Sequence, residues 1–106
     1  MSTTVYQSGF NYTEQSYTTE TGLQDLVIIN PSHRVTVVVE GGATDDVDLE
    51  IVLDDPNSSP SRLKLSENVL AGGSPYIRTL DGPVRAVGID IDGNNSNNIK
   101  LRVLTS

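Results

Sequence analysis

The only histidine of the chain, His33, is the first candidate for acid–base chemistry. It lies in a Pro31-Ser32-His33 turn, the chain contains no cysteine nucleophile, and no serine sits in a Gly-x-Ser-x-Gly elbow. A Ser-His-Asp site assembles in space and not along the chain, so the sequence leaves that arrangement open without arguing for it. We therefore expect an exposed turn histidine and no enzyme activity.

Carboxylates are the second candidate, because half of the 14 acidic residues fall within one short stretch. Oxygen-rich clusters at loop ends can hold calcium, a hard cation that takes about six to eight such ligands. The alternative is a solvated outer face with acidic loop tips, which protects an exposed sheet from edge pairing. We favour the acidic face, and expect neither a metal nor a cofactor. The acidic residues of this stretch are Glu40, Asp45, Asp46, Asp48, Glu50, Asp54 and Asp55.

A second acidic segment, Asp90-Ile91-Asp92-Gly93-Asn94, has the spacing that begins a calcium loop of the EF-hand type. That loop requires glycine at its sixth position and glutamate at its twelfth. The chain has Asn95 and Leu101 at those positions, so the pattern fails. The polar segment after Asp92 is adequately explained as a loop that tolerates left-handed backbone angles.

Sugar chemistry is disfavoured by the shortage of aromatic residues. Glycosidases place paired carboxylates in an enclosed cleft, and beyond residue 22 this chain has Tyr76 as its only ring. The same shortage weakens a glycan-binding hypothesis, unless the tyrosines of the first 22 residues form the platform.

Length and charge describe a single acidic domain. A chain of 106 residues is large enough for one core, and without cysteine it has neither disulfides nor a thiolate zinc site. The net charge of −7 repels phosphate-rich partners, so we do not expect nucleic acid as a ligand. No signal peptide and no long apolar run are visible, so we expect a soluble chain made in the cytoplasm, without membrane contact.

Apolar residues alternate with a period of two in two central segments, which is typical of half-buried strands. The segments are Arg34 to Glu40 and residues 47–53, and their parity is set because a one-residue slip would turn the apolar side outward. Two registers between them remain open. The residues predicted to point inward are Val35, Val37, Val39, Val47, Leu49, Ile51 and Leu53.

Other segments predict further strands. Residues 24–29 contain a continuous apolar run, which predicts a strand buried on both faces or nearly so. Residues 62–65 and 76–80 predict short strands, residues 54–61 a proline-containing loop, and residues 66–71 a helical turn.

The C-terminal part predicts a β-hairpin that closes the chain. A single register places apolar residues opposite one another on one face and opposite charges on the other, which is what specifies strand pairing. The expected pairs are Ile91 with Ile99, Ile89 with Leu101, Val87 with Val103, and Asp90 with Lys100.

Taken together, these segments predict an all-β fold, an antiparallel β-sandwich of about seven or eight strands. We assign residues 23–106 to the sandwich domain. Residues 1–22 carry rings among polar residues, and we expect either edge strands of the same domain or an extended N-terminal arm that docks on a neighbouring subunit.

Residues 81–91, Asp-Gly-Pro-Val-Arg-Ala-Val-Gly-Ile-Asp-Ile, are followed by a polar loop and a final strand. This segment resembles the closing part of small β-sandwich virion proteins of tailed bacteriophages, in which a Gly-Pro-(Val/Ile)-Arg-Ala-(Val/Ile) strand is common. The resemblance implies a structural virion protein, most directly a capsid decoration or cement protein on the capsid surface. The alternatives are a neck or tail component, or a module that binds glycans or a host surface.

The resemblance also implies that the partner is the major capsid protein or another virion protein. We expect a homo-oligomer around a symmetry axis, with a trimer favoured. The interface candidates are the rings of the N-terminal segment and two valines that face the acidic outer side, although single exposed valines are also ordinary. These candidates are Tyr6, Phe10, Tyr12, Tyr17, Val38 and Val52.

Overall fold

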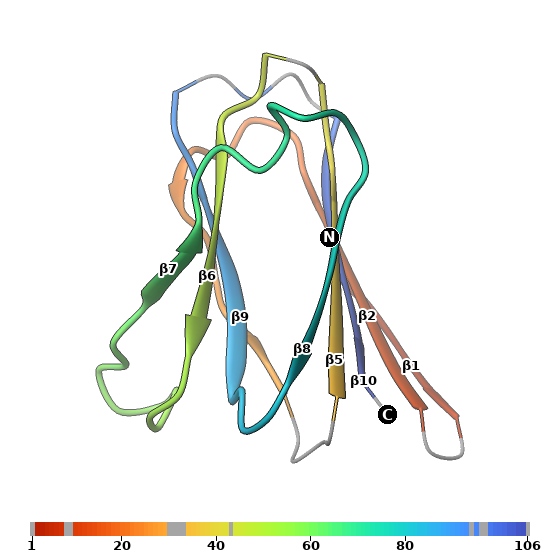
Figure 1. Cartoon of the computed structure of the whole chain (residues 1–106), viewed down its shortest axis with the longest axis vertical. Coiled ribbons are helices and arrows are strands. Elements are labelled where there is room, and N and C mark those ends of the chain that lie inside the picture. The colour runs from red at the N-terminus through yellow and green to blue at the C-terminus, as the bar shows by residue number, and fades with distance from the viewer. Residues whose placement is uncertain are drawn as a thin grey trace.

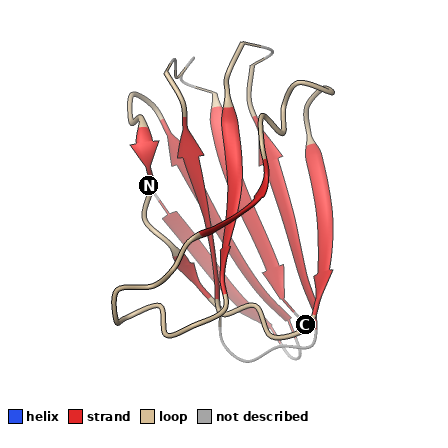
Figure 2. Cartoon of the chain, turned by 60° about the vertical axis from the view of Figure 1, so that its left-hand side comes forward, coloured by secondary structure: helices blue, strands red, loops and turns tan. Residues whose placement is uncertain are grey.

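The computed structural model describes residues 2–7, 10–29, 34–42, 44–93, 95 and 98–105, with the backbone alone for residues 2–7, 10 and 11. Within these residues the chain forms ten strands and no helix (Figure 2). In the same ranges there is accordingly no helix that could cross a membrane. The predicted all-β class is confirmed.

The strands form two antiparallel sheets that face each other (Figure 1). Sheet A has the order β1-β2-β10-β5-β8, and sheet B has the order β3-β9-β6-β7, with β4 also paired to β9. The strands of sheet A are β1 (Ser2–Gln7), β2 (Phe10–Tyr17), β10 (Ile99–Thr105), β5 (Arg34–Glu40) and β8 (Tyr76–Asp81). The strands of sheet B are β3 (Gly22–Leu23), β9 (Ala86–Ile91), β6 (Val47–Val52), β7 (Leu63–Ser66) and β4 (Val27–Ile28).

The core lies between the sheets and is built from aliphatic side chains at alternate strand positions. The predicted inward parity is confirmed for five residues that are 0 % exposed, namely Val35, Val37, Val39, Val47 and Leu49. The prediction is wrong for Leu53, which is 48 % exposed because β6 ends at Val52 and the chain turns into a loop.

The predicted C-terminal hairpin is wrong. β9 pairs with β6, β3 and β4 in sheet B, whereas β10 pairs with β2 and β5 in sheet A. Asp90 lies opposite Asp48, and Lys100 lies opposite Glu40 and Ser16. The physical reason is that alternation fixes which side of a strand is apolar, and an opposing sheet buries that side as well as a neighbouring strand does.

The same reason explains why β5 and β6 are not neighbours. β5 belongs to sheet A and β6 to sheet B, so neither of the two open registers is formed. Among the described strands, only β1 with β2 and β6 with β7 pair as sequential hairpins. Most other links carry the chain from one sheet to the other, as the loops at both ends of the sandwich show (Figure 1).

The apolar run at residues 24–29 is not one strand buried on both faces. It lies at the edge of sheet B, where the two-residue strands β3 and β4 pair with β9. Val27 is buried, but Ile28 is 54 % exposed, because an edge strand of a sandwich has one face toward solvent.

The predicted helical turn at residues 66–71 is not helical, and forms turns instead. The amide of Ala71 donates to the carbonyl of Asn68, and that of Gly73 donates to Leu70. These turns bury Val69 and Leu70 at one end of the core.

Residues 2–17 form two strands of sheet A. β1 pairs with β2, and β2 pairs with β10 along the whole of β10. Tyr17, at the end of β2, is part of the hydrophobic core. Residue 22, where the sequence suggested a boundary, lies within β3 and pairs with Ile91 of sheet B.

Candidate functional site

The structure brings two of the six interface candidates to one surface, the outer face of sheet A. Tyr12 on β2 lies opposite Leu104, and Val38 on β5 lies opposite Arg102, so both point away from the core. Ile77 on β8 lies opposite Val38 and is 62 % exposed. We did not predict Ile77, although it is the only apolar residue on its side of residues 76–80 in the alternating pattern.

Two other candidates are not accessible to a partner. Tyr17 is 6 % exposed, its burial raises the pKa of its phenol, and its hydroxyl donates to Gln15 Oε1 at 2.7 Å. Val52 does lie on the outer side of sheet B, but it is 0 % exposed because the chain covers that side itself. We therefore no longer treat Tyr17 and Val52 as interface candidates. The side chains of Tyr6 and Phe10, and the turn residue His33, lie outside the described residues.

A buried ion pair covers part of the outer side of sheet B. Arg62 Nε donates to Glu50 Oε1 at 2.8 Å, and the guanidinium also donates to the carbonyls of Gln24 and Ile89. A side chain at residue 88 would place its Cβ 2.6 Å from Arg62, so glycine at that position leaves room for the guanidinium. This arrangement explains why Glu50, a member of the predicted solvated acidic face, is buried instead.

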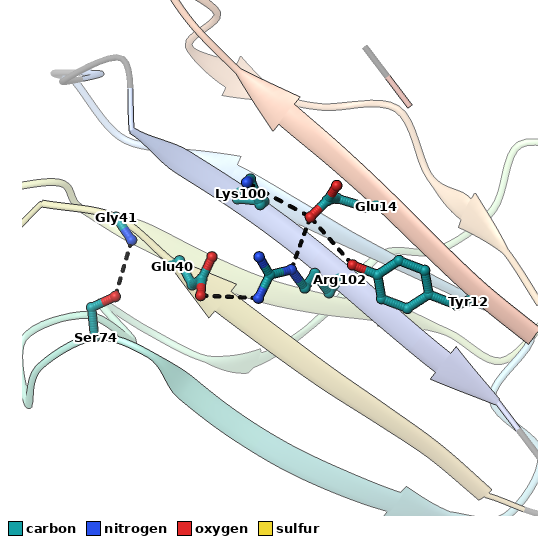
Figure 3. Close-up of polar contacts among 7 residues, drawn as sticks. All are labelled: Tyr12, Glu14, Glu40, Gly41, Ser74, Lys100 and Arg102. Atoms are coloured by element: carbon teal, nitrogen blue, oxygen red, sulfur yellow. Dashed lines mark hydrogen bonds and ion pairs between the residues drawn. The ribbon is translucent and has the colours of Figure 1, made fainter. Parts of the chain in front are cut away.

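Four of the charged side chains on the outer face of sheet A form one connected network together with Tyr12 (Figure 3). Glu14 accepts a hydrogen bond from Arg102 Nε at 2.9 Å and another from the Tyr12 hydroxyl at 3.2 Å. Lys100 Nζ lies 3.7 Å from the same carboxylate, and Arg102 Nη1 donates to Glu40 at 3.0 Å. Chiefly through its hydrogen bond, Arg102 lowers the pKa of Glu14, so this carboxylate stays ionised.

This face is balanced in charge, unlike the rest of the molecule. It carries three acidic and three basic residues, and the remaining 11 acidic and 4 basic residues account for the entire net charge of −7. Val38 and Ile77 lie between the network and the exposed pair of Arg34 with Asp81. The residues that define the outer face of sheet A are Tyr12, Glu14, Ser16, Arg34, Thr36, Val38, Glu40, Ile77, Thr79, Asp81, Lys100, Arg102 and Leu104.

The acidic stretch does not act as a single group. Asp46 and Asp48 meet Asp92, and a carboxylate oxygen of each lies within 4.8 Å of the others, so these three residues could ligate a hard cation. The sequence did not connect Asp92 with the other two because it lies 44 residues or more after them in the chain. The other acidic residues have separate partners, which include Arg102 for Glu40, Arg62 for Glu50 and the amide of Gly42 for Asp45.

The three carboxylates of this acidic triad lie close together, so the negative charge of one disfavours ionisation of its neighbour. Asp48 is buried, accepts from the amide of Asn68 at 2.9 Å and pairs with Lys64 at 3.2 Å. The neighbouring Asp48 carboxylate raises the pKa of the exposed Asp92. Oδ1 of Asp46 is buried and accepts no hydrogen bond within the described part of the chain.

We predict that Asp92→Asn makes the protein more stable at neutral pH. Because the pKa of Asp92 is raised in the folded state, folding favours its protonated form, and stability falls as the pH rises through the folded pKa. Asparagine keeps the shape and removes the repulsion. The expected result is a higher Tm at pH 7 in a buffer with chelator, and no gain near about pH 3, where aspartates are protonated.

Asp25→Asn, an exposed aspartate outside the triad, is the matched control and should leave Tm unchanged. A lower Tm for Asp92→Asn at pH 7 would show that the ionised carboxylate stabilises the fold and would contradict this reading of the triad.

No family model matches this chain, and no curated protein matches it. Two solved structures are distantly similar. One is a protein from Neisseria meningitidis, NMB1881, at 12 % identity and a TM-score of 0.45, covering 99 % of this chain and 82 % of that one. The other is the SPBc2 prophage-derived protein YomS, at 12 % identity and a TM-score of 0.48, covering 95 % of this chain and 97 % of that one. Because the identities and TM-scores are this low, the function has to be argued from the residues of this chain.

Proposed function

We propose that this chain is a structural virion protein of a tailed bacteriophage, and specifically a capsid decoration protein that binds the outer shell by protein–protein contacts. The phage assignment rests on the resemblance of residues 81–91 to virion proteins. The binding role is supported by one observation, the charge-balanced outer face of sheet A in a chain of net charge −7. Other acidic proteins can approach this face without the repulsion that the rest of the surface exerts.

The side chains on this face suit a docking surface. Arg102 and Lys100 are held by Glu14 and Glu40, so less side-chain entropy is lost when a partner binds. Tyr and Arg are among the residue types that most often dominate interface energies, and an exposed isoleucine adds apolar area. Ile77 and Val38 lie beside the Arg102 network in one row across β8, β5 and β10.

The segment that carries the resemblance links the two sheets. Gly82 has a φ of 110°, which favours glycine, and the amide of Val84 donates to its carbonyl. The backbone of Arg85 then bonds to Val52 and Ile29 on either side of it. The resemblance therefore covers residues that connect the two sheets of the sandwich. It does not identify the attachment surface, which has to be tested separately.

Cosedimentation with shells of the encoding phage tests the proposal. We expect saturable binding of many copies per shell, and Ile77→Glu should weaken it about tenfold or more, because a charge replaces apolar interface area. Ile77 is 62 % exposed, so this change should not affect folding. Leu63→Glu, at a leucine 46 % exposed on sheet B, is the matched control. Unchanged binding by Ile77→Glu would contradict the assigned face.

The distribution of the protein on intact virions separates the remaining alternatives. A decoration protein should appear in electron micrographs all over the capsid surface, as a homo-oligomer that we expect to be a trimer. A few copies at one vertex would indicate a neck or tail component. Binding on a glycan array together with no binding to shells would replace the proposal with a glycan-binding module.

A further inference from the structure

A second surface feature, a pocket at the opposite sheet, is not explained by the proposed docking face. The pocket has a volume of about 380 Å³ and lies where β4 meets the loop after β6 and the link between β8 and β9. Ile28, Pro56, Pro83 and Val84 supply apolar walls, and Arg85 is the charged residue among those that line it. Binding pockets are typically about 300–1,000 Å³ and mainly apolar with a few polar groups, so this one has the size for a small group.

Arg85 differs from the other basic residues of the chain. Arg34, Arg62, Lys64, Lys100 and Arg102 each pair with a carboxylate, and Arg78 donates to Ser66 Oγ at 3.0 Å. The exposed Arg85 side chain has no hydrogen-bond or ion-pair partner in the part of the chain that the structure describes. Its side chain is exposed, so its guanidinium can be reached by an anion from outside.

We infer that this pocket binds a segment of a partner protein in which a short aliphatic side chain stands next to a carboxylate. The aliphatic group would fill the apolar walls, and the carboxylate would pair with Arg85, whose planar guanidinium suits carboxylate geometry. The choice of a protein segment rests on the proposed function. The acidic chain repels anions in general, so recognition of a carboxylate here depends on the direct contact with Arg85.

Two main-chain hydrogen bonds hold the backbone of Arg85 in place beside the pocket. Its amide donates to the carbonyl of Val52 at 2.8 Å, and its carbonyl accepts from the amide of Ile29 at 2.9 Å. Both bonds are made by the main chain, so replacement of the exposed side chain leaves them intact. Arg85→Gln consequently tests the pocket without removing a contact that holds the sandwich together.

The experiment is a titration followed by amide chemical shifts of the full chain labelled with ¹⁵N. The probe is acetyl-Gly-Leu-Asp-Gly-amide, and we expect saturable shifts at Ile28, Val84 and Arg85 with a Kd of about 1 mM, as for a single small anchor. The Leu-Asn form of the peptide should bind about fivefold more weakly or worse, because it lacks the charge. The peptide with glycine in place of leucine should show no saturation, because it lacks the aliphatic side chain.

Two protein variants complete the test. Arg85→Gln should weaken the binding of the Leu-Asp peptide about fivefold, whereas Arg34→Gln, at another exposed arginine, should leave it unchanged. Equal affinity of the Leu-Asp and Leu-Asn peptides, or full binding by Arg85→Gln, would overturn the inference. Tighter binding of free 4-methylpentanoate than of the peptide would also overturn it, because the site would then be one for a small carboxylic acid.

This test is independent of the shell-binding test. If the protein does not bind shells but the peptide titrates at the pocket, the decoration role fails and the pocket assignment stands. If shells bind through the outer face of sheet A and the peptide causes no shifts, the pocket inference fails alone.

Discussion

Deletion of residues 1–17 is expected to abolish cooperative folding. β2 pairs with the full length of β10, so its removal leaves the central strand of sheet A with an unpaired edge. The same deletion removes Tyr17, which is 6 % exposed and packs in the core. Thermal and urea unfolding should show no cooperative transition, and the exposed edge should favour aggregation.

Deletion of residues 1–7 alone is the matched control for this experiment. β1 pairs with β2 and, within the described residues, with no other strand, so its loss turns β2 into the edge of an otherwise intact sheet. We expect a folded protein of lower stability. A cooperative transition in the chain that lacks residues 1–17 would show that the N-terminal segment is an appended arm, and would contradict its role in the sandwich.

Arg62→Met is expected to lower the free energy of unfolding by about 3 kcal/mol, the lower end of the range for breaking a buried ion pair. The pair is well shielded, since the side chains of Arg62 and Glu50 are 18 % and 8 % exposed. Without the guanidinium, the carboxylate of Glu50 remains buried without its counter-charge, and two backbone carbonyls lose a donor. Urea unfolding at neutral pH measures the difference.

Two further variants separate charge burial from loss of packing. Arg34→Met breaks an ion pair with Asp81 whose side chains are 62 % and 73 % exposed, so its effect should stay within about 0.5 kcal/mol. Arg62→Met combined with Glu50→Leu should recover most of the lost stability, because no unpaired charge is then buried. A double variant as unstable as Arg62→Met would show that the loss comes from packing.

The fold class and the faces of the central strands could be predicted from the sequence. Alternation in β5 placed Val35, Val37 and Val39 inward, and the parity of Val47 and Leu49 in β6 was equally clear. Turn residues also marked the loop at residues 54–61 correctly. These properties are local, because a period of two in hydrophobicity is set by the geometry of a single strand.

The pairing of strands could not be predicted in the same way. The pattern in β9 and β10 is satisfied by a hairpin and equally by two strands in opposite sheets, and only the second arrangement occurs. The acidic triad shows the same limit, since Asp92 reaches Asp46 and Asp48 through pairing of β9 with β6. The outer face of sheet A likewise combines β2, β10, β5 and β8, which are distant in sequence.

The sequence by itself thus determined that this protein is an acidic all-β domain and which sides of its central strands are apolar. The tertiary structure alone decided which strands are neighbours, and with them the charge-balanced outer face of sheet A, the burial of Tyr17 and Val52, and the pocket beside Arg85. The physical reason is that side-chain alternation specifies what each strand buries, whereas the choice between a neighbouring strand and an opposing sheet depends on the packing of the whole chain.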